Sequence, residues 1–160
     1  MLSVTILCVG NLKEKYWRDA ADEYIKRLTR FCKINIVEIS EEKCVDNPSA
    51  AQIQNVIEKE GARIISKIPQ GAKCISLCIE GKGYSSETLS KEIEGFASGG
   101  CSHICFIIGG SFGLDGKIKV QSSVRLSMSQ MTFPHQMARI MVLEQIYRAF
   151  QISSGGKYHK

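Results

Sequence analysis

The sequence predicts an α/β domain with a mostly parallel β-sheet and helices on both faces of that sheet. Short apolar segments rich in Val and Ile alternate along the chain with longer segments whose apolar residues recur every three or four positions. The chain has 160 residues, of which 44% are hydrophobic, enough apolar material for one core. We therefore expect a single domain spanning residues 1–160.

The first half of the chain predicts two strands and two helices. They are expected at residues 4–9 (strand), 16–28 (helix), 34–39 (strand) and 49–67 (helix). Gly10 and Asn11 provide a turn after the first strand, and charged residues separate the apolar positions of the first helix. Ser49, followed three residues later by Gln52, predicts a capping box at the start of the second helix.

The second half continues the alternation of strands and helices. Strands are expected at residues 74–79, 103–108 and 124–127, and helices at 85–98 and 134–152. Gly81 and Gly83 end the first of these strands, and Gly99 with Gly100 ends the helix that follows. The pattern over residues 117–123 is short and does not distinguish helix from strand.

The last helix is apolar nearly all round. Its apolar residues are Met137, Ile140, Met141, Val142, Leu143, Ile146, Tyr147, Ala149 and Phe150. A helix of this kind is buried on two sides, and in a domain of this size the sheet covers only one of them. We therefore predict a homodimer that forms through this helix.

The cysteines do not predict a metal site or a disulfide framework. There are seven, an odd number, and no Cys-x-x-Cys pair is present. Cys101, His103 and Cys105 would share one face of a strand, but three residues on a single strand lack the fourth ligand of a tetrahedral zinc site. We expect reduced, mostly buried thiols and no bound metal.

Charge and hydropathy indicate the compartment and the possible partners. The formal net charge is +5, with basic residues grouped near both ends of the chain, which permits an anionic partner such as a nucleic acid. Residues 1–10 lack the long apolar run of a signal peptide or membrane span, so we expect a cytoplasmic protein without membrane contact.

Two loops about fifteen residues apart predict a ligand site. Ile107–Gly113 is an apolar strand end followed by paired glycines, where a ligand can approach the backbone. Residues Leu126–Met137 contain a polar loop that ends in Pro134, a residue suited to the start of a helix. Because ligands of parallel α/β sheets bind beyond the carboxyl ends of the strands, these loops predict a cleft for a flat, polar small molecule.

The motifs of the commonest nucleotide sites are absent. No G-x-G-x-x-G sequence follows the first strand, where the chain reads Val9-Gly10-Asn11-Leu12, and there is no G-x-x-x-x-G-K-[ST] phosphate loop. These absences disfavour NAD and ATP as the ligand.

With these motifs in place, the chain resembles the SPOUT methyltransferases, which contain an α/β trefoil knot, and within them the ribosomal large-subunit methyltransferase H family. The resemblance runs over the whole chain. It rests on residues 9–10 and 13–17, 77–82, 108–113, 126–139, 144–149 and the terminal Tyr158-His159-Lys160. It implies a knot in the C-terminal part of the fold, a rare exception to the rule against threaded chains.

The resemblance also implies an activity. Members of this family transfer a methyl group from S-adenosylmethionine to N3 of a pseudouridine in 23S rRNA of assembled ribosomes. The residues implied to contact the cofactor are Leu77, Gly109, Met128, Ser129, Gln130, Met131, Thr132 and Phe133. Two alternatives stay open: a SPOUT methyltransferase acting on another RNA such as tRNA, and a non-catalytic RNA-binding dimer.

The implied reaction directs attention to the C-terminal tail. N3 of pseudouridine is a weakly acidic imide that must lose its proton, and His159 is the candidate to assist because imidazole titrates near neutrality. Tyr158 is expected to stack on a base and Lys160 to hold a phosphate. Arg139 is a further candidate for RNA binding, whereas His135 is expected to be structural.

Arg148 follows Glu144 by four residues on the last helix, which predicts an ion pair between them rather than a binding role.

Overall fold

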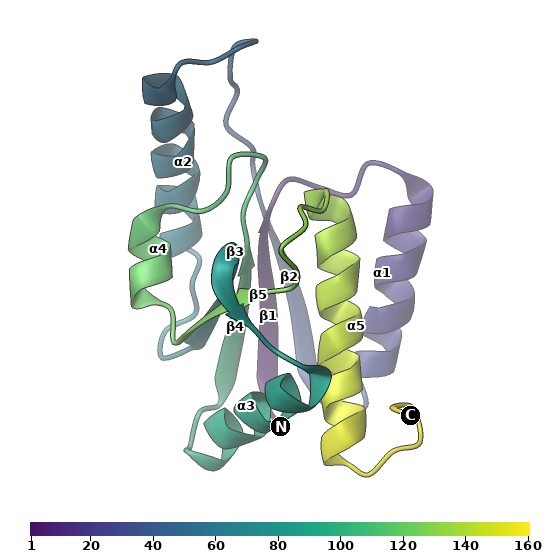
Figure 1. Cartoon of the computed structure of the whole chain (residues 1–160). Helices are drawn as coiled ribbons and strands as arrows, with labels where there is room; N and C mark the ends of the chain where they lie inside the picture. Colours follow the sequence, from purple (N-terminus) through teal and green to yellow (C-terminus); the bar gives the residue numbers. More distant parts are fainter.

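The computed structural model describes residues 1–160 and contains one five-stranded sheet in the order β2-β1-β4-β3-β5 (Figure 1). Every strand pair is parallel. The strands are β1 (Ser3–Val9), β2 (Lys33–Ile39), β3 (Lys73–Gly83), β4 (His103–Ile108) and β5 (Val124–Ser127). Because all strands run the same way, their carboxyl ends meet along one edge of the sheet, and the predicted α/β class is confirmed.

Five helices connect the strands. They are α1 (Lys15–Leu28), α2 (Ala50–Ile65), α3 (Ser86–Ser98), α4 (Gly116–Gln121) and α5 (His135–Ser153). Figure 1 shows α2 and α4 together on one side of the sheet and α1, α3 and α5 on the other. The prediction of helices on both faces is therefore confirmed.

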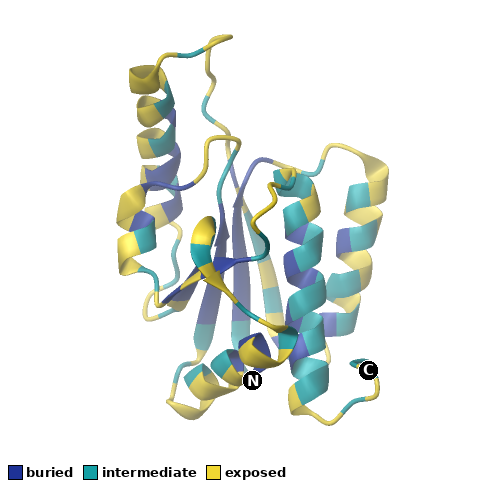
Figure 2. Ribbon diagram, in the orientation of Figure 1, coloured by how far each residue is buried: buried dark blue, intermediate teal, exposed yellow.

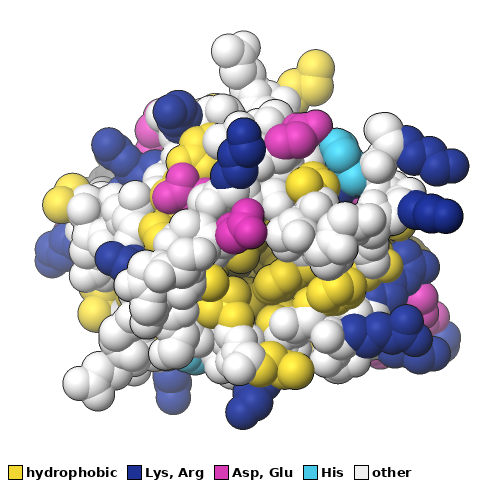
Figure 3. Space-filling view, turned by 90° about the horizontal axis from the view of Figure 1, so that it is seen from below, with side chains coloured by type: hydrophobic (Ala, Val, Ile, Leu, Met, Phe, Trp, Pro, Cys, Tyr) yellow, Lys and Arg dark blue, Asp and Glu magenta, His cyan; other side chains and the backbone are white.

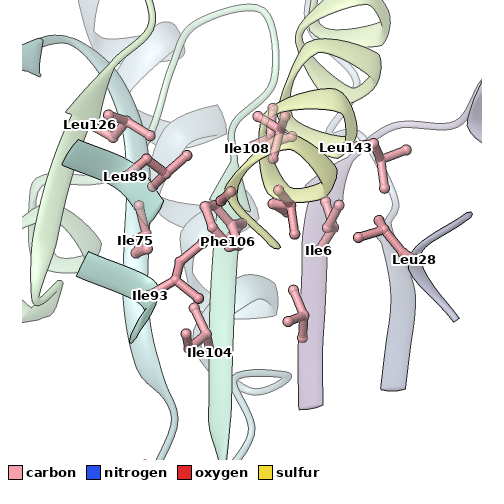
Figure 4. Packing of buried hydrophobic residues seen from close by; sticks show 14 of the residues in the cluster. Ile6, Leu28, Ile75, Leu89, Ile93, Ile104, Phe106, Ile108, Leu126 and Leu143 are labelled. Atoms are coloured by element: carbon pink, nitrogen blue, oxygen red, sulfur yellow. The ribbon is translucent and has the colours of Figure 1, made fainter. Parts of the chain in front are cut away.

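The central strands β1 and β4 are buried along nearly their whole length because each face of the sheet supports its own core (Figure 2). Ile6, Phe106 and Leu143 belong to the larger core cluster, beneath α1, α3 and α5, and Figure 4 shows their side chains packed between the sheet and the helices. Leu7 and Ile118 belong to the smaller cluster, beneath α2 and α4. Parallel strands covered on both faces are expected to be apolar throughout, as the sequence indicated.

Most element boundaries agree with the sequence to within two residues, and the differences have local causes. The capping box of α2 is present: the Ser49 hydroxyl accepts from the Gln52 amide at 3.2 Å, and the Gln52 side chain accepts from the Ser49 amide at 2.8 Å. The ambiguous residues 117–123 contain α4, whose N-cap Asp115 accepts from the Lys117 amide at 2.9 Å. Strand β3 continues past Ile79 because its last residues pair with β5.

Helix α5 is buried, as its composition predicted, and most of its covering comes from other elements of the same chain. Its inner residues, such as Leu143 and Ile146, pack in the larger core cluster, while α1 and α3 lie against its flanks. No residue from Ala138 to Ile152 is fully exposed. Part of the covering that we expected from a second subunit is thus supplied by neighbouring helices, so the composition of α5 alone does not require a dimer.

The cysteine and histidine side chains of β4 take structural positions. His103 Nε2 lies 2.8 Å from the Thr5 hydroxyl, and Cys105 is buried opposite Cys74 on β3. All seven cysteines are free thiols, and no three His, Cys, Asp or Glu side chains gather in the geometry of metal ligands.

Two surface features complete the description. None of the helices combines the length and the hydropathy needed to cross a lipid bilayer. Figure 3 shows the molecule from below relative to Figure 1. On this surface, hydrophobic side chains gather in a hollow near the middle, and Lys and Arg side chains lie mostly around its margin.

Candidate active site

A cleft of about 890 Å³ lies beyond the carboxyl ends of β3, β4 and β5. Three chain segments and the first turn of α5 form its walls. The lining residues are Leu77–Glu80, Ile108–Leu114, Lys119, Leu126, Met128, Ser129, Met131–His135 and Ala138. The two loops that the sequence singled out therefore meet in one cleft, at the edge where a parallel sheet binds ligands.

The first wall is an interruption in the pairing of β3 with β5. Leu126 pairs with both Leu77 and Lys82, so the four residues from Cys78 to Gly81 leave the ladder and project along the cleft. Gly81 permits this because the backbones nearly touch there: a Cβ atom on Gly81 would lie 2.7 Å from the carbonyl oxygen of Arg125. No other residue type fits at this position without moving the strand.

The second wall is the glycine loop after β4. A Cβ atom on Gly109 would lie 2.9 Å from the carbonyl carbon and oxygen of Gly113, so the two ends of the loop touch. Gly113 has φ +89°, a conformation that L side chains rarely adopt. Since no side chain intervenes at Gly109, Gly110 and Gly113, a ligand can reach the peptide groups themselves.

The third wall is the polar loop between β5 and α5, which hydrogen bonds within itself. Ser127 Oγ donates to the Ser129 carbonyl at 3.0 Å, and Ser129 Oγ accepts from the Met131 amide at 3.0 Å. Met128 packs against the core, whereas Met131 is 74% exposed. The loop thus presents both apolar side chains and backbone groups to the cleft.

Seven of the eight expected cofactor residues line this cleft. They are Leu77, Gly109, Met128, Ser129, Met131, Thr132 and Phe133. The eighth, Gln130, is not among the lining residues. A mixture of apolar side chains and unhindered peptide groups is suited to a flat base with a polar edge, and the residues present therefore fit a nucleoside-type cofactor.

His135 also lines the cleft, which the sequence had not indicated. Its Nε2 is buried without a hydrogen-bond partner and lies 3.7 Å from the carboxylate of Glu41. Glu41 follows β2 and is distant in sequence, so no local pattern relates the two residues. The expectation of a structural role for His135 stays a prediction, and its side chain lies in the cleft wall.

The C-terminal tail lies elsewhere on the chain, against the outer half of α5. Tyr158 donates to the Glu144 carboxylate at 3.1 Å, and burial together with this carboxylate raises the pKa of Tyr158 to about 12. His159 Nδ1 lies 3.2 Å from Nη1 of Arg148, and Lys160 is exposed. Arg148 is about 20 Å along α5 from His135 at the helical rise of about 1.5 Å per residue. The tail therefore does not reach the cleft of its own chain.

Two arginines of α5 hold protein partners. The predicted ion pair between Arg148 and Glu144 is confirmed, with Nη2 2.6 Å from Oε1. Arg139, which we expected to bind RNA, is only 2% exposed. It donates to Glu38 at 2.8 Å and to the Gly10 carbonyl at 2.9 Å. Burial and these bonds correct that expectation, because the guanidinium of Arg139 is not presented to a surface ligand.

Comparisons with known proteins place this geometry in a family. A family model described as "Predicted SPOUT methyltransferase" matches residues 2–159. A protein named ribosomal RNA large subunit methyltransferase H from Clostridioides difficile (strain 630) is 46% identical over 159 residues, covering 99% of this chain and 100% of the relative. A protein of the same name from Clostridium botulinum (strain Alaska E43 / Type E3) is 50% identical with the same coverage.

A solved structure supports the fold. A probable methylase family protein from Haemophilus influenzae Rd KW20 superposes with a TM-score of 0.54 at 13% identity, covering 100% of this chain and 72% of that one. At this identity the likeness concerns the fold alone. The full-length family match and the identity to the relatives together establish that this chain belongs to the SPOUT methyltransferases, enzymes whose methyl donor is S-adenosylmethionine.

Proposed function

We propose that the protein transfers a methyl group from S-adenosylmethionine to N3 of a pseudouridine in 23S rRNA of the assembled ribosome. The single observation that carries this proposal is the cleft in which the glycine loop 109–113 meets the loop 128–133 at the carboxyl edge of the sheet. The full-length relatives are named for methylation of large-subunit ribosomal RNA. A net charge of +5 is compatible with a polyanionic substrate.

The methyl donor would be held mainly by the backbone of the two loops. Gly109 and the segment from Met128 to Phe133 would surround the adenine and ribose, with Leu77 and Met128 giving apolar contact; Gln130 would act from outside the wall. When bound, the donor supplies an activated methyl group on a sulfonium, so much of the protein's work is to place the acceptor nitrogen in line with it. The knot expected for this family would fix the same two loops.

The acceptor side of the site would be completed by a second copy of the chain. Ile79, Phe112 and Met131 line the cleft and are 52%, 38% and 74% exposed, and Met137 on the first turn of α5 is 36% exposed. Exposed apolar side chains grouped at one place commonly mark an interaction surface. A homodimer formed along α5 would cover them.

In such a dimer the tail of one protomer would lie at the cleft of its partner. This arrangement would place a tail at each cleft, although each tail lies about 20 Å from the cleft of its own chain. Tyr158 would stack on a base, Lys160 would contact phosphate, and His159 would act beside the target nucleotide. We propose that each chain contributes a single domain, residues 1–160, and that the enzyme acts in the cytoplasm, where ribosomes are found.

The direct test is methylation of ribosomes that lack the modification. Purified protein, S-adenosylmethionine and such ribosomes should yield N3-methylpseudouridine among the nucleosides of the 23S rRNA, detected by mass spectrometry, and reactions without the methyl donor should not. If the protein binds the donor but leaves the rRNA unchanged, the substrate is another RNA such as tRNA. A protein that binds RNA but not the donor would be a non-catalytic dimer.

A further inference from the structure

His135 is the only imidazole that lines the donor cleft. Its side chain is 22% exposed, on the first turn of α5, beside cleft residues Pro134 and Ala138. His103 lies at the other end of β4, hydrogen bonded to Thr5, and His159 belongs to the tail. Cys78, Glu80 and Lys119 also line the cleft, but Glu80 and Lys119 pair with each other, and burial raises the pKa of the Cys78 thiol. Within one chain, His135 is therefore the lining imidazole available to accept a proton.

The two nitrogens of the His135 ring differ in their surroundings. Neither takes part in a hydrogen bond, and only Nε2 is buried. Nε2 faces the carboxylate of Glu41 at 3.7 Å, and a side chain on Gly10 would approach it to 3.1 Å. A small rotation of the partly exposed Glu41 side chain would bring the pair to the usual N–H···O distance of about 2.9 Å. With the proton on Nε2, the accessible Nδ1 has a free lone pair.

Gly10 is the residue that allows this arrangement. It has φ +87°, and a Cβ atom there would lie 3.0 Å from Glu41 Oε1 and 3.1 Å from His135 Nε2. Its amide donates to the Ile39 carbonyl at 2.8 Å, which ties the end of β1 to the end of β2 just before Glu41. The ends of two strands and the start of α5 thus hold imidazole and carboxylate together.

On these observations we propose that His135 accepts the proton of the target nitrogen and that Glu41 positions and stabilises its imidazole. This inference rests on the proposed function. The N3–H proton passes to Nδ1 of His135, the N3 electron pair bonds to the methyl carbon, and the carbon–sulfur bond breaks with its electrons remaining on the neutral thioether. The geometry gives His135 the proton-accepting role that the sequence had given to His159.

Substitution of each partner tests the inference. The variant His135→Asn should lower kcat by about 10²- to 10⁴-fold at saturating donor and ribosome, because a proton acceptor contributes on that scale. Its affinity for S-adenosylmethionine should change by less than roughly threefold, since the donor contacts are mainly backbone. Glu41→Gln should lower kcat less, on the order of tenfold, without changing KM for ribosomes.

Matched controls and pH profiles separate chemistry from folding. His103→Asn, at the opposite end of β4, and Asp46→Asn, in the same segment as Glu41, should retain wild-type kcat. The acid limb of the wild-type pH–rate profile should vanish in His135→Asn and persist in His159→Asn. The substitution His159→Asn should instead raise KM for ribosomes. A His135→Asn enzyme with normal kcat, or one whose only defect is loss of donor affinity, would overturn the inference. If the wild-type protein does not methylate ribosomes, the proposed function fails first.

Discussion

Nδ1 of His159 lies 3.2 Å from the guanidinium of Arg148, and its Nε2 lies 2.8 Å from the carboxylate of Glu87. Because Arg148 can only donate, the hydrogen bonds are satisfied when Nδ1 accepts from Arg148 and Nε2–H donates to Glu87. The tail is thereby held between α3 and α5. In the proposed dimer, a tail that serves the partner's cleft would have to leave these contacts.

The contact between His159 and Glu87 should weaken at acid pH. A backbone hydrogen bond and His159 lower the pKa of Glu87 from 4.5 to about 2. A carboxyl whose pKa is lower in the folded state stabilises that state fully above its unfolded pKa and loses this contribution as pH falls through the folded value. Retention of the tail should therefore weaken between about pH 4.5 and pH 2.

Nuclear magnetic resonance titration of the Glu87 carboxyl carbon measures this directly. In the variant His159→Ala the pKa of Glu87 should rise only part of the way towards 4.5, because the backbone hydrogen bond remains. Glu58, which receives a hydrogen bond from Gln54 on α2, serves as the internal reference and should not respond to the substitution. An unchanged Glu87 titration in His159→Ala would show that the tail is not docked in solution.

The close approach of β3 and β5 makes Gly81 sensitive to substitution. In Gly81→Ala the new methyl group would lie 2.7 Å from the Arg125 carbonyl oxygen, so the strand must move. We expect a loss of about 1–3 kcal/mol of stability and a weaker affinity for the methyl donor. Gly83→Ala is the matched control, since nothing lies within 4 Å of the position its methyl group would take. Urea unfolding and donor titration should separate the two variants, and equal behaviour would contradict the described bulge.

The fold was largely predictable because its signals are local. Each signal involves residues only a few positions apart: the strand and helix periods, the Ser49–Gln52 capping box, and the glycines that end β3 and α3. The exception is α4, only six residues long, which depends on the Asp115 cap. Helices this short carry too few apolar positions for a period to be recognised.

The site was predictable in part. The glycine loop and the polar loop could be placed in one cleft because both follow strands of a parallel sheet, and the resemblance to a family supplied the individual residues. The pairing of His135 with Glu41, 94 positions apart, depends on where strand ends meet and leaves no local trace. The same is true of Arg139, because no local pattern in the last helix indicates its partner Glu38, 101 positions away.

The cysteine thiols should differ sharply in reactivity. Burial raises the pKa of Cys8 to about 11 and that of Cys32 to about 12, so both are neutral thiols near pH 8. Cys44 is the most exposed of the seven cysteines. Iodoacetamide at about pH 8 should therefore modify Cys44 first, because the thiolate is the nucleophile and must be reached by the reagent.

Peptide mass spectrometry of briefly alkylated protein tests this. Cys44→Ser should abolish the fast phase, whereas all seven cysteines should react in denaturant. Rapid labelling of Cys8 or Cys32 in the folded protein would mean that the core beneath α1 and α5 opens readily.

The buried ion pair of Glu38 and Arg139 should contribute more to the free energy of unfolding than an exposed ion pair does. The Arg139 side chain is 3% exposed, so Glu38→Ala leaves a buried guanidinium with only the Gly10 carbonyl as a partner. Such a group costs about 1–3 kcal/mol, and we expect a loss of that size in urea unfolding. Glu23→Ala removes an exposed partner of Arg27 and should have a clearly smaller effect on stability, because solvent screens exposed ion pairs. Equal effects of the two substitutions would mean that solvent reaches Arg139, and that the start of α5, which carries His135, is less firmly held than its hydrogen bonds indicate.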